Sequence, residues 1–136
     1  MIEKGGRYRN LRFLLGVCGQ SPQRPPGKDE TIQAFVITAY KNYEALKTLT
    51  LALSRRGLCV IHADAQGAIT ARQVDELNAL PNVRAIRKYK VNWGSVCHLY
   101  ALLDLCRMAL EDERVDYLHL MSAQDVPLLC ADEMER

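Results

Sequence analysis

The chain has 136 residues, of which 49% are hydrophobic and 25% are charged, and its formal net charge is +2. This composition is that of a globular domain or of part of a larger one, and the small net charge gives no electrostatic signature of nucleic-acid binding. The five cysteines form no Cys-x-x-Cys pair, so we interpret them as small buried hydrophobes rather than as zinc ligands. No signal peptide and no apolar run long enough to cross a bilayer is evident, which predicts a cytoplasmic or peripheral membrane protein.

The N-terminal residues, 1–29, are predicted to form a flexible tail. They contain Gly5-Gly6 and a stretch at 21–27 with three prolines, which is typical of loops and disorder. The ordered domain is therefore expected to comprise residues 30–136.

Two kinds of apolar segment alternate through this domain. Short continuous apolar runs predict strands of a parallel sheet that is covered on both faces, and apolar residues three or four positions apart predict helices. Their alternation indicates an α/β domain. In chain order we expect strand 33–39, helix 43–56, strand 58–64, helix 70–79, strand 83–86, helix 96–110, strand 116–121 and the start of a helix at 131–134.

Residues with known capping preferences mark the ends of these helices. Thr70 and Ser95 precede the second and third helices, where a hydroxyl can accept hydrogen bonds from the first free backbone N–H groups. Arg55, Arg56 and Gly57 are predicted to close the first helix, because cations favour the last turn and glycine the position after it.

Polar residues follow each of the four predicted strands. The carboxyl ends of parallel strands meet at one edge of the sheet, and α/β sheets bind ligands at that edge. We therefore expect a ligand site formed by the loops 40–42, 62–64, 89–95 and 122–127.

The loop 87–95 holds the only tryptophan, Trp93. One interpretation is a structural corner in which Trp93 packs in the core while Lys88 and Lys90 are solvated. The other is an anion site at the start of the next helix, where free N–H groups favour negative charge and Gly94 lets the backbone approach closely. The sequence leaves both interpretations open.

Asp64 ends the second predicted strand, two residues after His62. A carboxylate at this place can accept from a ribose hydroxyl or a base N–H, although Asp is equally common in turns. His62 is either a hydrogen-bonded core group or half of a metal pair with Asp64, for which no third ligand is evident.

The turn after the last strand carries Ser122 and Asp125. The two lack a matched histidine for nucleophilic chemistry, and Asp125 can also be a turn residue shaped by the following Pro127. No Gly-x-Gly-x-x-Gly, Walker A or Asp-x-Asp pattern occurs, which argues against a Rossmann dehydrogenase, a P-loop NTPase and a metal–diphosphate pair.

Four segments in a defined order resemble a known family. They read Phe-Val-Ile-Thr-Ala-Tyr-Lys-Asn, Val-Ile-His-Ala-Asp, Tyr-Lys-Val-Asn-Trp-Gly-Ser and Leu-Met-Ser-Ala-Gln-Asp-Val-Pro-Leu. Together they resemble the core-2/I-branching β-1,6-N-acetylglucosaminyltransferase family, which also includes peptide O-xylosyltransferases, and its bacterial members in particular. The similarity runs from about residue 34 to residue 134. Four residues depart from the family pattern, namely Tyr40, Ala65, Ser95 and Val126.

The resemblance implies a GT-A-like, Rossmann-related nucleotide-sugar-binding half-domain with a mainly parallel sheet. It implies inverting transfer of a sugar of the GlcNAc or xylose type from a UDP-sugar to a glycan or protein acceptor. Neither a metal nor another cofactor nor a nucleic-acid partner is implied, and the full-length enzyme can associate with a membrane. The substrate-binding residues that the resemblance indicates are Tyr40, Asp64, Trp93, Gly94, Ser122, Gln124 and Asp125.

In that family the catalytic base and the basic residues that offset diphosphate charge lie further downstream, which here means beyond Arg136. The resemblance therefore implies that residues 30–136 are the N-terminal part of a glycosyltransferase domain, truncated at its C-terminus and inactive by itself. Two alternatives stay open from the residues alone. One is a non-catalytic nucleotide-sugar or glycan-binding module, or a decayed fragment, and the other is a small phosphate-signalling protein of flavodoxin-like outline.

Overall fold

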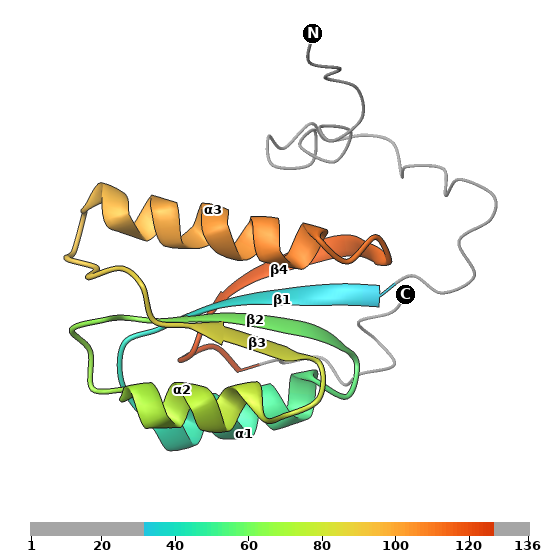
Figure 1. Cartoon of the computed structure of the whole chain (residues 1–136), viewed down its shortest axis with the longest axis horizontal. Coiled ribbons are helices and arrows are strands. Elements are labelled where there is room, and N and C mark those ends of the chain that lie inside the picture. The colour runs from blue at the N-terminus through green and yellow to red at the C-terminus, as the bar shows by residue number, and fades with distance from the viewer. Residues whose placement is uncertain (1–31, 127–136) are drawn as a thin grey trace, which may run out of the picture.

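The computed structural model describes residues 32–126, which form a four-stranded sheet between two layers of helices (Figure 1). All three strand pairings are parallel, so the predicted α/β fold with a parallel sheet is confirmed. The predicted tail and the helix start at 131–134 lie outside the described residues. The elements are β1 (Ile32–Ala39), α1 (Tyr43–Leu53), β2 (Gly57–Ala63), α2 (Ala71–Asn78), β3 (Val83–Ile86), α3 (Val96–Leu110) and β4 (Val115–Ser122).

The strand order is β3-β2-β1-β4, so the chain reverses its direction of travel across the sheet after β3. Helix α3 carries the chain back over the sheet to β4, which pairs with the other side of β1 (Figure 1). Thr38, near the end of β1, is in register with His62 of β2 on one side and Ser122 of β4 on the other. This register brings the carboxyl ends of the three strands to one edge.

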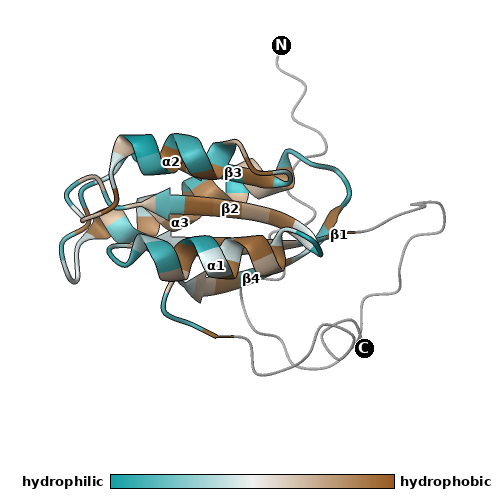
Figure 2. Ribbon diagram, turned by 90° about the horizontal axis from the view of Figure 1, so that it is seen from below, coloured by the Kyte–Doolittle hydropathy of each residue, from teal (hydrophilic) through white to brown (hydrophobic). Residues whose placement is uncertain are grey.

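Both faces of the central strands β1 and β2 are buried, which explains their continuous apolar runs, whereas Tyr117 and Leu120 of the edge strand β4 are exposed. Phe35 and Ile37 of β1 point toward the cluster beneath α1 and α2, while Ala34 and Val36 point toward the cluster beneath α3. Figure 2 shows the apolar residues of α1 and α2 as brown bands beside teal, solvent-facing ones. Among residues 32–126, no helix is long and apolar enough to span a bilayer.

The predicted cap of α2 is confirmed. The Thr70 hydroxyl accepts from the backbone N–H of Gln73 at 3.3 Å, and the Gln73 side chain accepts from the backbone N–H of Thr70 at 2.9 Å. This reciprocal pair satisfies two N–H donors at the start of the helix.

The predicted bounds of α3 are confirmed, but the capping bond predicted for Ser95 and the predicted end of α1 are wrong. Ser95 does precede α3, but its hydroxyl forms no capping hydrogen bond and is buried without a partner among the described residues. Helix α1 ends at Leu53 rather than at Arg56, and Gly57 is the first residue of β2. A Cβ atom at Gly57 would lie 2.1 Å from the backbone oxygen of Gln33, so glycine is needed here for close strand contact rather than as a helix cap.

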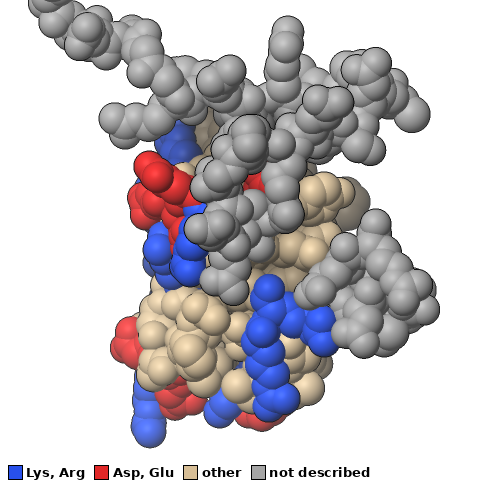
Figure 3. Space-filling view, turned by 90° about the vertical axis from the view of Figure 1, so that its right-hand side faces the viewer, with Lys and Arg blue, Asp and Glu red and all other residues tan. Residues whose placement is uncertain are grey.

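The end of the molecule where the strands begin carries mixed charges. Figure 3 shows acidic and basic side chains near one another there, beside uncharged surface. After α3, Arg114 pairs with Asp112 at 2.8 Å, and Arg84 of β3 pairs with Glu111 at 3.3 Å. Charges of opposite sign therefore offset one another at this end, away from the carboxyl edge.

Candidate functional site

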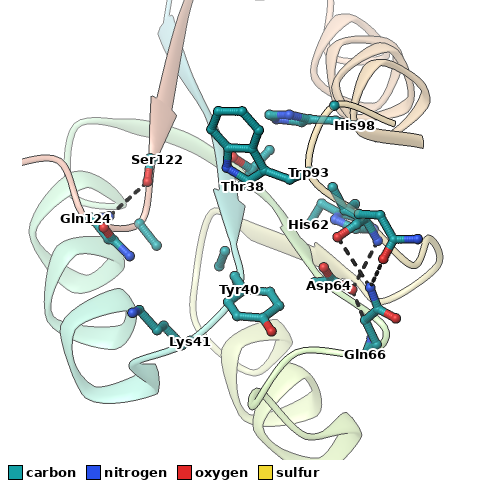
Figure 4. Close-up of a pocket in the computed structure, with 15 residues that line it drawn as sticks. Thr38, Tyr40, Lys41, His62, Asp64, Gln66, Trp93, His98, Ser122 and Gln124 are labelled. Carbon is teal, nitrogen blue, oxygen red and sulfur yellow. Dashed lines mark hydrogen bonds between the residues drawn. The ribbon is translucent and has the colours of Figure 1, made fainter. Parts of the chain in front are cut away.

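A pocket of about 800 Å³ lies at the carboxyl edge of the sheet (Figure 4). Segments that follow β1, β2, β3 and β4 all contribute to its wall, so the predicted meeting of the four loops is confirmed. Residues at the carboxyl ends of both β1 and β4 line the pocket, and the direction of travel across the sheet reverses between these two strands, at the kind of switch point where open α/β sheets bind ligands. Its lining residues are Thr38, Ala39, Tyr40, Lys41, His62, Asp64, Gln66, Val91, Asn92, Trp93, Gly94, His98, Ser122, Ala123 and Gln124.

Tyr40 and Lys41 lie directly after β1, on the floor of the pocket in Figure 4. Asn42 follows them with a positive φ of 62°, and its side chain caps α1 by accepting from the backbone N–H of Ala45. The backbone oxygen of Tyr40 accepts from Ala68 at 3.0 Å. The phenol itself is exposed, so Tyr40 presents a ring to the pocket on a backbone held at both sides.

Asp64 follows β2 and is only 3% exposed. Its Oδ1 atom accepts from the backbone N–H of Gln66 at 2.9 Å and from that of Val91 at 3.2 Å. The other oxygen, Oδ2, accepts no hydrogen bond from the described residues. The turn role that the sequence allowed for Asp64 is therefore confirmed, and its ligand role stays a prediction.

His62 is buried, and its Nε2 atom accepts from the backbone N–H of Tyr89 at 3.1 Å. Burial lowers the pKa of His62, and the nearby Asp64 carboxylate offsets this effect only in part. The interpretation of His62 as a hydrogen-bonded core group is therefore confirmed. Among residues 32–126, no cluster of three His, Cys, Asp or Glu side chains could hold a metal ion.

Trp93 is fully exposed, so the interpretation that placed it in the core is wrong. The loop between β3 and α3 turns outward at Gly94, whose φ of 74° lies in the left-handed region that glycine adopts without strain. Figure 4 shows the indole beside the pocket, near Thr38 and His98. An exposed aromatic ring at a pocket wall offers a flat apolar surface to a bound ligand.

The segment after β4 forms a tight turn. The Asp125 carboxylate accepts from the backbone N–H of Ser122 at 2.6 Å, and the Ser122 hydroxyl accepts from the backbone N–H of Gln124 at 3.2 Å. Ser122 and Gln124 line the pocket, but Asp125 does not. Asp125 therefore shapes the turn, as one of its two sequence interpretations predicts, and it acts on the pocket only through its neighbours.

Six of the seven residues indicated by the resemblance thus line one pocket. The sequence analysis did not single out several other residues that line the same pocket. Gln66 donates to the side chain of Asn92 at 2.7 Å and joins the loops that follow β2 and β3. His98 lies one turn into α3, and Lys41 supplies a cation on the opposite side (Figure 4). Their position in the sequence could have indicated them, because each lies within a few residues of a strand's carboxyl end or of the start of α3.

The pocket contains one carboxylate, Asp64, among its described lining residues, together with amide, hydroxyl and aromatic groups. Such a mixture suits a polar ligand with hydroxyl or N–H donors and a flat ring. The fold and the pocket together define an α/β domain with a polar pocket at the carboxyl edge of a parallel sheet.

The chain belongs to the Core-2/I-Branching enzyme family, whose model matches residues 33–136. The family resemblance read from the four sequence segments is therefore confirmed. Membership implies glycosyltransferase activity in general, with a sugar donor and an acceptor. No curated protein matches the chain in sequence.

Proposed function

We propose that the pocket binds a UDP-sugar donor, of the UDP-GlcNAc or UDP-xylose type, for inverting transfer to a glycan or protein acceptor. The observation that carries this proposal is that Tyr40, Asp64, Trp93, Gly94, Ser122 and Gln124 line one pocket at the switch point of the sheet. These residues come from segments far apart in the sequence.

The chemistry of the pocket supports a nucleotide at the Asp64 side. The free Oδ2 atom of Asp64 can accept from a uracil N–H or a ribose hydroxyl, and its ionised form makes such a bond strong. The exposed rings of Tyr40 and Trp93 provide flat surfaces for the base or the sugar. The turn at Ser122–Gln124 lies across the pocket from Asp64 in Figure 4, and we propose that it contacts the other end of the donor.

We propose that transfer proceeds without a metal ion. The diphosphate then has to be stabilised by side chains. Apart from His62, the described lining residues with a basic or ionisable nitrogen are Lys41 and His98. In an inverting reaction a base takes the proton of the acceptor hydroxyl as its oxygen attacks the anomeric carbon and UDP leaves. Because Asp64 has one oxygen bonded to the loops, we assign the base to a residue outside the described pocket.

Calorimetry on the full chain tests the proposal, with UDP and the matched purine nucleotide ADP as ligands. Saturable binding of UDP, with ADP clearly weaker, is expected because the pocket would recognise the uracil edge. An absence of saturable UDP binding by the folded chain would refute the proposal.

A second candidate is binding of a nucleotide-sugar or glycan without transfer. The observation that favours it is the involvement of Asp64, the only carboxylate in the described lining, in holding two loops. A transfer assay with UDP-GlcNAc and UDP-xylose, run on the chain together with the downstream residues expected to supply the base, distinguishes the two, because a binding module saturates with UDP but forms no product.

A further inference from the structure

Tyr89 lies outside the pocket lining, yet it joins three elements around the pocket. Its backbone N–H donates to Nε2 of His62 at the end of β2, at 3.1 Å. Its backbone oxygen accepts from the N–H of Ala65, in the loop after β2, at 2.9 Å. The main chain of Tyr89 is thus fixed to β2 and to the segment that follows it.

The side chain of Tyr89 extends the connection to α3. Its hydroxyl donates to Oδ2 of Asp104 at 2.6 Å, and the ammonium of Lys88 donates to the same oxygen at 2.7 Å. The ring lies between two others, with centroids 5.8 Å from His62 and 6.3 Å from Tyr100. The hydrogen bonds from Lys88 and Tyr89 hold the pKa of Asp104 below its usual range, so this carboxylate stays ionised and a strong acceptor.

The chain continues from Tyr89 directly into the pocket wall. Val91, Asn92, Trp93 and Gly94 all line the pocket, and α3 begins at Val96. This segment, residues 90–95, is therefore held at one end by Tyr89 and at the other by α3. The hydroxyl of Tyr89 links the first end of this segment to the middle of α3, where Asp104 lies.

We propose that Tyr89, through its hydrogen bond to Asp104, is a positioning residue that holds Trp93 in place beside the pocket. The identity of the ligand rests on the proposed function, but the positioning itself does not. Without the hydroxyl, the loop after β3 loses one of its two links to Asp104 of α3, the other being the ion pair of Lys88, and segment 90–95 gains freedom to move. Trp93 then spends less time where a bound ligand would contact it.

The test uses Tyr89→Phe in the full chain, with Tyr117→Phe as the matched control. The control removes a hydroxyl from an exposed tyrosine of β4 that forms no hydrogen bond with the described residues. Trp93 is the only tryptophan, so the anisotropy of intrinsic tryptophan emission reports on its mobility without a label. UDP titration followed by the same emission gives the affinity.

Tyr89→Phe should lower the anisotropy of the Trp93 emission and weaken UDP binding by about 3- to 10-fold, the range for one lost hydrogen bond. Asp104→Ala, which removes the acceptor that Tyr89 and Lys88 share, should lower the anisotropy at least as far, and adding Tyr89→Phe to it should cause no further change. Tyr117→Phe should change neither reading. These effects have to appear at temperatures where circular dichroism shows each variant fully folded.

Unchanged anisotropy in folded Tyr89→Phe would overturn the inference, even if UDP binding weakened, because Trp93 would then not depend on the link. If the unsubstituted chain fails to bind UDP, the proposed function fails, while the anisotropy of the variants still decides the positioning role. A fall in stability alone, without a change in anisotropy, would identify Tyr89 as merely structural.

Discussion

The Oδ1 atom of Asp64 accepts a hydrogen bond from the backbone N–H of Val91, 27 residues further along the chain, at 3.2 Å. The same oxygen accepts from Gln66, in its own loop. One carboxylate therefore fixes the loop after β2 to the loop that carries Trp93. A change at Asp64 should alter both the ligand contact and the shape of the pocket wall.

Asp64→Asn is expected to weaken UDP binding by about 1–3 kcal/mol, the range for losing a hydrogen bond to a charged group. The amide keeps one acceptor but replaces the other oxygen with a donor, which cannot accept from a uracil N–H. Isothermal titration calorimetry on the folded variant measures the change. Asp116→Asn, at an exposed aspartate in β4, is the matched control and should bind as tightly as the unsubstituted chain. Equal affinity in both variants would remove Asp64 from the site.

Asp125→Asn tests whether Asp125 contacts the substrate, as the family resemblance implies, or only shapes the turn, as its hydrogen bond indicates. Asp125 does not line the pocket, and an amide oxygen can still accept from the backbone N–H of Ser122. The affinity for UDP should therefore stay unchanged. If Asp125 instead contacted the bound UDP directly, Asp125→Asn would weaken UDP binding as Asp64→Asn does. The same calorimetric titration decides between the two.

Gly67→Ala should disturb the pocket through Tyr40. A Cβ atom at Gly67 would lie 2.3 Å from the backbone oxygen of Tyr40, so the two loops have to separate. We expect a loss of stability of about 1–3 kcal/mol, as for other overpacked sites, together with weaker UDP binding. Urea denaturation and calorimetry measure the two effects.

Gly57→Ala provides the comparison for this prediction. Its Cβ atom would clash with the backbone of Gln33 where β1 and β2 begin, far from the pocket. It should reduce stability but leave the UDP affinity of the folded molecules unchanged. If both glycine variants bind UDP normally, the contact between Gly67 and Tyr40 has no part in ligand binding.

The stability of the fold should fall as the pH drops below the ordinary pKa of histidine, about 6.5. Burial lowers the pKa of His62 and of His119 in the folded state. Between the lowered pKa and the ordinary value the unfolded chain binds more protons, so protonation favours unfolding. This contribution to stability is complete above the ordinary pKa and is lost as the pH falls through the folded-state values.

Urea denaturation between neutral pH and mildly acidic pH measures this slope. His62→Gln should reduce it without abolishing it, because glutamine can accept from the Tyr89 N–H while His119 still titrates. A slope in His62→Gln as steep as that of the unsubstituted chain would mean that His62 does not contribute.

Chelation should leave donor binding intact. We expect UDP to bind with the same affinity in EDTA as in manganese, because the proposed site stabilises the diphosphate through side chains. Calorimetry in the two buffers, on the same preparation, is the measurement. Binding that disappears in EDTA and returns with manganese would contradict metal-independent transfer.

Local patterns in the sequence determined the elements and their order. The apolar runs predicted the strands, most clearly the central β1 and β2, which are buried on both faces, and the Thr70–Gln73 cap depends only on residues three apart. Polar residues after each strand predicted one ligand edge, because parallel strands end on the same side. These inferences need only the period of the backbone and the chemistry of near neighbours.

Tertiary structure decided what the loops do. Trp93 is exposed because its loop is tied to the segment after β2 through Asp64, His62 and Ala65, and no local pattern specifies those contacts. Asp125 does not line the pocket, and its carboxylate accepts from the backbone N–H of Ser122 in the same turn. Both outcomes depend on the strand order β3-β2-β1-β4, which sets the neighbours of each loop. That order is chosen by packing across the whole sheet, so residues far apart in the sequence determine which of two locally reasonable roles a side chain takes.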